Sequence, residues 1–116
     1  MSLKENDLKD RLFCFALNVL RMLGTIKGGK ETEVIKYQLS KSSTSSGANY
    51  EESQAASSKA DFINKVNISL KEMRESNYWL RIIKELFPNT KDIASLVNES
   101  EELSKILASI ILKARS

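Results

Sequence analysis

The stretch Leu39–Ser53, "LSKSSTSSGANYEES", decides how the rest of this sequence is interpreted. Six serine and threonine residues lie between Ser40 and Ser46, and Gly47 follows directly. At about 0.5 kcal/mol for each hydroxyl residue and about 1 for glycine, a helix here is disfavoured by roughly 4 kcal/mol relative to alanine. Composition therefore favours a flexible linker between two halves of the chain slightly over a helix.

A helical spacing nevertheless runs through the same stretch. Small residues let two helix backbones approach closely, and their hydroxyls can bond to carbonyls one turn back. Inside a bundle, a helix of these residues from Glu31 to about Ser53 is therefore as reasonable as a linker. The spacing is carried by Ile35, Leu39, Ser42, Ser46 and Tyr50.

The segment before this stretch reads as a helix that runs to Leu23. Ser2 and Glu5 have the spacing of a capping box, and Gly24 begins a glycine-containing loop. Apolar residues recur every three or four positions, and additional ones widen the stripe beyond what one partner helix would bury. The stripe is Leu8, Leu12, Phe15, Ala16, Val19 and Leu23, widened by Phe13, Leu17 and Leu20.

Two more helices are expected after the stretch. The first starts at Ser58, whose hydroxyl can cap it together with Asp61, and runs to Phe87. The second follows Pro88, with Asn89 or Thr90 as its cap. The first has a face made of Phe62, Val66, Ser69, Met73, Leu80 and Ile83, and the second has a seam made of Ile93, Leu96, Leu103, Leu107, Ile110 and Ala114.

The helix from Ser58 to Phe87 carries a second apolar flank formed by Trp79, Ile82 and Leu86. A bundle helix normally needs one apolar stripe about 100° wide. The flank therefore indicates either a helix sunk more deeply into its own core or a contact between subunits. The sequence leaves both interpretations open.

The middle of the chain resembles the four-helix-bundle family encoded in intervening sequences of 23S ribosomal RNA genes. The segments that carry the resemblance are "QLSKSSTSSGANYEES", "QAASSKADF" and "SLKEMRESNYWL", from Gln38 to about Leu80. Asn49 and Glu52 fall on the family motif, share one helix face, and are expected to form a structural network with a neighbouring helix or subunit. The resemblance implies that the serine run is helical.

The same resemblance implies a role. Related proteins, including accessory proteins of diversity-generating retroelements, look like ring-shaped pentamers that bind nucleic acid. The chain departs from the family where relatives carry paired arginines, because it has Ser40 and Lys41 there, and it has Gln54–Ser57 in place of an arginine-rich turn. These departures weaken the transfer of nucleic-acid binding to this chain.

Composition limits the chemistry that is available. The chain has 116 residues, one cysteine and no histidine, so histidine-based catalysis and histidine-ligated zinc are excluded. Carboxylate clusters such as Glu99, Glu101 and Glu102 are expected to be solvated or to cap helices. Cys14 is expected to be a small buried hydrophobe in a reducing, cytoplasmic setting. No enzyme activity, cofactor, metal, small-molecule substrate or membrane contact is expected.

A cationic stripe on the third helix is the most suggestive functional feature. Lys71, Arg74, Arg81 and Lys84 fall within roughly 140° of arc, with Tyr78 among them. Such a stripe could follow a phosphate backbone and stack a base, although Glu85 lies inside the same arc. The alternative is a solvated face with intrahelical ion pairs.

The prediction is an all-α protein, an antiparallel up-down-up-down four-helix bundle forming one domain over residues 1–116. Its expected function is a non-enzymatic, self-associating module that binds RNA or DNA or acts as a scaffold, with itself as partner in a homo-oligomer, possibly a pentamer. The alternative is a protein–protein adaptor that does not bind nucleic acid.

Overall fold

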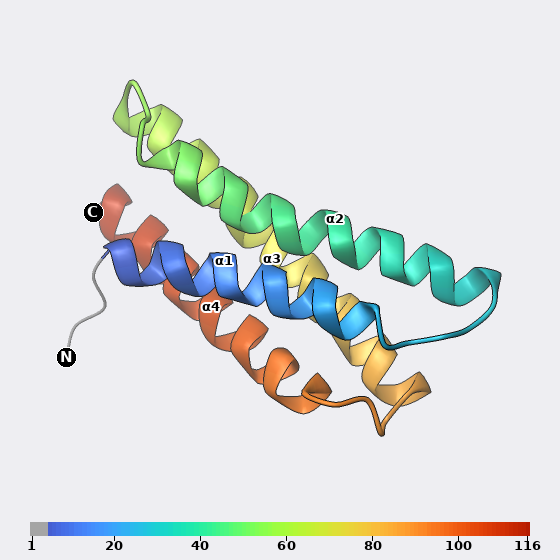
Figure 1. The fold of residues 1–116 in the computed structure, drawn as a ribbon. Coiled ribbons are helices and arrows are strands. Elements are labelled where there is room, and N and C mark those ends of the chain that lie inside the picture. Colours follow the sequence, from blue (N-terminus) through green and yellow to red (C-terminus); the bar gives the residue numbers. More distant parts are fainter. Residues whose placement is uncertain (1–4) are drawn as a thin grey trace.

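Four helices make up the bundle in the computed structural model, which describes residues 5–116. They are α1 (Glu5–Leu23), α2 (Lys30–Ser53), α3 (Lys59–Leu86) and α4 (Ile93–Arg115). Successive helices run in opposite directions, each packs on the next, and α4 packs on α1 (Figure 1). The predicted up-down-up-down bundle is confirmed. The predicted capping pair, Ser2 with Glu5, lies outside the described side chains.

All four helices contribute to one apolar core. The predicted stripes supply it, because residues three and four apart lie on the same face of a helix. Tyr50 of α2 is 1% exposed and is the largest of the fully buried side chains. The same core contains Leu12, Phe15, Val19, Leu39, Val66, Met73, Leu80, Leu103 and Leu107, each no more than 2% exposed.

The serine run is helical along its whole length, so the linker interpretation is wrong. Three serines of α2, at positions 42, 43 and 46, are fully buried. Ser46 Oγ donates to Ser69 O of α3 over 2.8 Å, and Ser69 Oγ donates back to Ser46 O over 2.7 Å. Because each hydroxyl reaches the partner's backbone, the two helices pack very closely here. Packing thus outweighs the unfavourable helix propensity.

Gly47 allows a close contact between α2 and its other neighbour, α1. A Cβ atom at this position would lie 3.4 Å from Leu12 Cβ and 3.6 Å from the Leu12 carbonyl oxygen of α1. Glycine is therefore placed where the backbones of α1 and α2 come together. In α2 the small residues at adjacent positions serve two different partner helices.

The prediction that Cys14 is buried is wrong, because its side chain is exposed. Cys14 lies within a continuous apolar run, but each residue advances by 100° around a helix, so a run cannot face the core at every position. Leu12 and Phe15 take the core side, whereas Phe13 remains 62% exposed. Cys14 falls in a shallow groove beside α4, which also contains Asn18.

The predicted caps of the fourth helix are also wrong. α4 begins at Ile93, and the residue before it, Asp92, has a left-handed backbone with φ of 68°. Before the helix, Thr90 N donates to Phe87 O and Ile93 N donates to Thr90 O. The chain reverses direction after α3 through these two turns. Asn89 and Thr90 are part of the turns and therefore do not cap α4. By contrast, Ser58 caps α3 as predicted, accepting from Asp61 N over 3.0 Å.

Candidate nucleic-acid interface

Two adjoining hollows form a groove between α3 and α4. The first has a volume of roughly 550 Å³ and is called the Arg74 hollow; its lining consists of Arg74, Asn77 and Arg81 from α3 with Glu101, Ser104 and Lys105 from α4. Helical periodicity places the α3 members on the side that faces α4. The hollow thus collects three cations and one carboxylate from two helices.

The second hollow, called the Tyr78 hollow, has a volume of roughly 610 Å³ and shares Arg81 and Glu101 with the first. The shared residues make the two hollows one continuous groove, called here the α3–α4 groove. Unlike the first hollow, the Tyr78 hollow has aromatic and aliphatic side chains in its lining. Its remaining lining is Tyr78, Ile82, Lys84, Glu85 and Leu86 from α3 with Val97 and Asn98 from α4.

Arg81 is held in position at the junction of the two hollows. Its Nε donates to Asn77 Oδ1 over 2.9 Å, and its guanidinium carbon lies 5.8 Å from the centre of the Tyr78 ring. Asn77 Nδ2 in turn donates to Ser100 Oγ over 2.9 Å, and Ser100 is completely buried. The guanidinium is therefore fixed from the core outward, so less side-chain entropy is lost when it binds an anion.

Tyr78 presents an aromatic surface next to this cation. Half of the residue is exposed, and its ring meets the Trp79 ring edge-on, with 5.1 Å between centroids and 72° between planes. An edge-on neighbour fixes the ring without covering both of its faces. The ring can therefore accept a flat partner.

The structure brings most of the predicted nucleic-acid residues together. Arg74, Tyr78, Arg81 and Lys84 all line the groove, whereas Lys71 is exposed on α3 and lines neither hollow. Lys105 of α4 is the residue that sequence reasoning missed. Its only signal is the four-residue spacing from Glu101, which is equally typical of a solvated helix face.

The three predicted oligomer residues occupy two different environments. Trp79 is partly buried against the chain's own core, and its Nε1 donates to Glu75 Oε2 over 3.3 Å. Leu86 is 57% exposed and, together with the half-buried Ile82, lines the Tyr78 hollow. Within one chain, the deeper-core interpretation describes Trp79, and Ile82 and Leu86 remain candidates for a subunit contact.

The two motif residues do not form a network with a neighbouring helix of the same chain. Asn49 Nδ2 donates to Ser45 O over 2.9 Å and to Ser45 Oγ over 3.1 Å, both within α2. Glu52 is exposed. Asn49 is partly buried, and its amide bonds to the carbonyl one turn back in its own helix.

A polar cluster lies on the α2–α3 surface near this pair. Partial burial, reinforced by the charge of Glu75, raises the pKa of the Glu72 carboxyl. Lys71, Lys41 and a hydrogen bond from Ser45 oppose that rise. The cluster has no excess of cations, because Lys71 and Lys41 are balanced by Glu72 and Glu75.

The carboxylates of α4 have a structural role that the sequence did not reveal. Glu99 Oε1 and Oε2 accept from Arg11 Nη2 and Nε of α1 over 2.6 and 3.1 Å, and Glu102 lies 3.4 Å from the same guanidinium. The expected solvated or capping role is therefore wrong for Glu99, whereas the side chain of Glu102 remains 64% exposed. Within residues 5–116, no group of three or more histidine, cysteine or acidic side chains is arranged to hold a metal ion.

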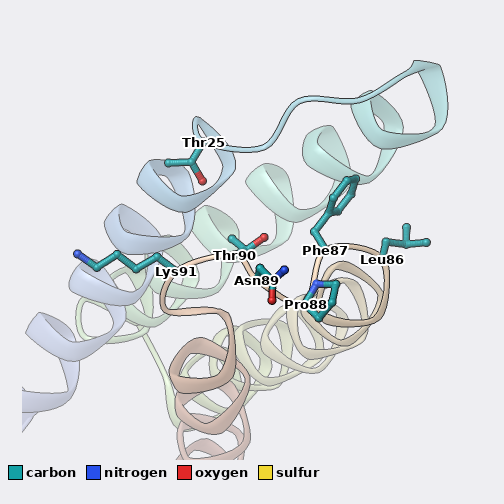
Figure 2. A pocket seen from close by; sticks show the side chains of 7 residues that line it. All are labelled: Thr25, Leu86, Phe87, Pro88, Asn89, Thr90 and Lys91. Atoms are coloured by element: carbon teal, nitrogen blue, oxygen red, sulfur yellow. The ribbon is translucent and has the colours of Figure 1, made fainter.

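A further hollow of roughly 550 Å³ lies at the turn between α3 and α4, next to Thr25. Pro88, Asn89 and Thr90 of the turn line it together with Lys91, whose side chain extends away from the other residues (Figure 2). With its one cation pointing outward, this hollow does not gather charge as the α3–α4 groove does. No helix among the described residues is long and apolar enough to cross a membrane.

Comparisons with known proteins agree with this architecture. One family, described as "23S rRNA-intervening sequence protein", matches residues 4–109. A crystal structure of a protein of unknown function from the S23 ribosomal protein family of Bacteroides thetaiotaomicron is similar, with 38% sequence identity and a TM-score of 0.80. The similarity covers 90% of this chain and 97% of that one. No curated protein matches the chain.

Proposed function

The chain belongs to the family of 23S rRNA-intervening sequence proteins, and on that premise we propose that it is a non-enzymatic, self-associating module that binds nucleic acid through the α3–α4 groove. One observation carries the proposal. Cations that are far apart in the sequence, Arg74, Arg81 and Lys84 on α3 and Lys105 on α4, line a single groove. Clustered cations, rather than a global excess, are what neutralise a phosphate backbone.

The local charge supports an anionic ligand. Four cations line the groove against two carboxylates, Glu85 and Glu101, whereas the whole chain carries a net charge of only +3. The groove thus holds most of the protein's excess positive charge. It restores, with a different set of residues, cations that the chain lacks at the family's arginine positions.

Self-association would strengthen binding, because several copies of a groove that binds weakly alone could hold the same strand. The resemblance to accessory proteins of diversity-generating retroelements supports a ring, with a pentamer as the expected form. Copies of the groove around such a ring would bind one strand with a high effective concentration. Ile82 and Leu86, at the apolar end of the groove, are the proposed contact residues. A free thiol at Cys14 suits the proposed cytoplasmic setting.

Binding needs no catalytic group, and the chain offers little to support catalysis. Histidine is absent from the sequence, and the carboxylates Glu99 and Glu102 of α4 are paired with Arg11. We therefore propose that the protein is not an enzyme.

Salt titration of RNA and DNA binding tests the proposal. Contact with several phosphates predicts a steep linear fall of log K with log salt concentration. Replacing Arg74, Arg81, Lys84 and Lys105 by glutamine should abolish binding at ~50 mM salt. The matched control replaces two exposed arginines and two exposed lysines elsewhere, Arg21, Arg115, Lys27 and Lys59, and so removes the same charge. Equal loss in both variants, or no binding by the wild type, would reject the groove.

A protein–protein adaptor is the second candidate, favoured by the apolar end of the groove, where Leu86 is 57% exposed. An adaptor would keep its protein partner when the four groove cations become glutamine. It would lose that partner when Leu86 is changed to serine. A nucleic-acid-binding protein would lose RNA or DNA when the four groove cations become glutamine and would keep it when Leu86 is changed to serine.

A further inference from the structure

We propose that the α3–α4 groove takes single-stranded rather than duplex nucleic acid, with one unstacked base on Tyr78 read by the carboxylate of Glu101. The inference rests on the proposed function and specifies its ligand. It follows from the way the two hollows divide their chemistry. Three cations and no aromatic or aliphatic side chain line the Arg74 hollow, which suits a phosphate, whereas the ring of Tyr78 and several aliphatic side chains line the Tyr78 hollow, which suits the face of a base.

The two hollows lie side by side, so one nucleotide of an extended strand could place its phosphate in the first and its base in the second. They adjoin at Arg81, which lies against Tyr78 and lines both hollows. A strand with its phosphate at Arg74, Arg81 and Lys105 therefore brings its base to Tyr78. In a duplex the base faces are stacked inside the helix, and phosphate contacts alone would leave the Tyr78 hollow unused. Aromatic platforms beside a cationic groove are typical of single-strand binding.

Tyr78 is prepared for stacking. Half of the residue is exposed, while Trp79 fixes its ring by an edge-on contact and Arg81 lies over it. A ring already fixed in this way loses little conformational freedom when a base stacks on it. Leu86 lies about two helical turns from Tyr78 along the same hollow, so a subunit contact at Leu86 would leave the Tyr78 end open.

Glu101 is the unexpected member of the groove, because a carboxylate repels phosphate. Among the described residues, ion pairs within 4 Å form at Lys9, Arg11 and Lys36, and none of them involves Glu101. Its carboxylate is thus not committed to Arg81 or Lys105, although it borders both hollows. An uncommitted carboxylate can accept hydrogen bonds from a ligand.

The chemistry of a carboxylate selects the base. A carboxylate only accepts hydrogen bonds, so it fits a base edge that donates, such as the amino group at position 4 of cytosine. Uracil carries a carbonyl oxygen at the same position, and its one donor on this edge, N3–H, lies between two carbonyl oxygens that repel a carboxylate. Glu101 should therefore favour amino-bearing bases over uracil. Cytosine and uracil form a matched pair of probes, because both are pyrimidines of the same size that differ only in the group at position 4 and in the proton on N3.

Fluorescence anisotropy with ten-residue oligo-rC, ten-residue oligo-rU and an RNA duplex of equal length tests the inference. The wild type should bind oligo-rC about fivefold to tenfold more tightly than oligo-rU, and both more tightly than the duplex. Tyr78→Leu should weaken both single strands about tenfold without changing the salt slope, since the phosphate contacts remain.

Glu101→Gln should remove the preference for oligo-rC, because an amide both donates and accepts. Glu85→Gln is the matched control: it removes the same charge from the same groove, so it should strengthen both ligands equally and keep the preference. Equal binding of oligo-rC and oligo-rU by the wild type, or of duplex and single strands, overturns the inference while the proposed function stands. Absence of any binding at ~50 mM salt overturns both.

Discussion

At the scale of single residues, serine is the polar residue of this core. Among the described residues, the buried polar side chains are all serines apart from the hydroxyl-bearing Tyr50, and no buried side-chain nitrogen or oxygen lacks a hydrogen-bond partner. Some hydroxyls bond one turn back, as Ser53 Oγ does to Tyr50 O over 2.6 Å. Others bridge helices, as Ser42 and Ser76 do over 2.8 Å. A hydroxyl can be buried cheaply when a carbonyl lies one turn away.

Cys14 gives a direct check on one side chain. Because its thiol is exposed on α1 beside α4, a maleimide reagent should label it fully in the native protein, at the rate of an exposed thiol. Mass spectrometry of the intact protein, before and after addition of denaturant, measures the labelling. Labelling that needs denaturant would mean that a neighbouring subunit covers this face of α1.

Glu72 predicts an unusual pH dependence. Its pKa is raised above the ordinary 4.5, mainly by burial, so its stabilising contribution is complete below that value and is lost as pH rises through the higher folded-state pKa. Glu72→Gln removes this loss. The stability of the variant relative to wild type should therefore increase from about pH 4 to pH 7. Urea unfolding at several pH values measures it, and a relative stability that falls over this range would contradict the assignment.

At the scale of elements, the four helix pairs are held by different means. The α2–α3 pair is the most extensive and is joined by small residues and reciprocal serine bonds. The α1–α4 pair is the least extensive, and the Arg11 ion cluster bridges it. The bundle therefore has one tight backbone-to-backbone seam and one looser, charge-bridged seam.

Ser46 tests the tight seam. Ser46→Ala loses hydrogen bonds to α3 and should cost about 1 kcal/mol in the free energy of unfolding, as denaturant titration measures it. Ser46→Leu adds bulk where the backbones meet and should cost about 3 kcal/mol. Thr44→Leu is the control, because Thr44 is exposed on the same helix and should change little. Equal stability of the Ser46→Leu and Ser46→Ala variants would show that the helices do not need the close approach.

Arg11 tests the looser seam. Arg11→Ala removes a bidentate pair with Glu99 and the contact to Glu102, with both members of the main pair about 30% exposed, so it should cost about 1 kcal/mol at low salt. Lys9→Ala removes a 4.0 Å pair with Glu51 whose partners are about half exposed, and should cost no more than about 0.3 kcal/mol. Denaturant titrations at low and high salt measure both. A cost for Arg11→Ala that is no larger than that for Lys9→Ala would show that the cluster does not join α1 to α4.

At the scale of the whole molecule, the exposed apolar side chains bear on the proposed self-association of the bundle. Several large apolar side chains remain exposed on one chain, among them Phe13, Tyr37, Leu86 and Leu112. Those at the apolar end of the α3–α4 groove lie next to the proposed binding residues. An assembly through that end would place neighbouring grooves near each other, which gives self-association a functional consequence.

Light scattering at micromolar concentration tests the assembly. Ile82→Ala should reduce the measured mass with little effect on the unfolding of the subunit, because Ile82 lies in the groove. Trp79→Ala should also lower subunit stability, since Trp79 packs on the chain's own core. Leu112→Ala, 70% exposed on α4, is the control and should leave the mass unchanged. A wild-type mass equal to that of one chain would rule out the proposed ring.

Much of this protein follows from the sequence alone. Local sequence patterns determined three of the four helices, their core faces and the Ser58 cap, because those features depend on neighbours within about four residues. The serine run was the exception: its own residues left linker and helix open, and only the resemblance to a family favoured the helix. The α3 half of the groove was also visible, because Arg74, Tyr78 and Arg81 lie on one helix.

Only the tertiary structure decided which groups from different helices meet. It paired Ser46 with Ser69, joined Arg11 to Glu99 rather than leaving that carboxylate in solvent, and completed the groove with Lys105 and Glu101 of α4. It also left Cys14 exposed inside an apolar run. The physical reason is the same in each case. Spacing along the chain determines which side of its own helix a residue occupies, whereas the rotation and height of each helix against its neighbours come from packing the entire core.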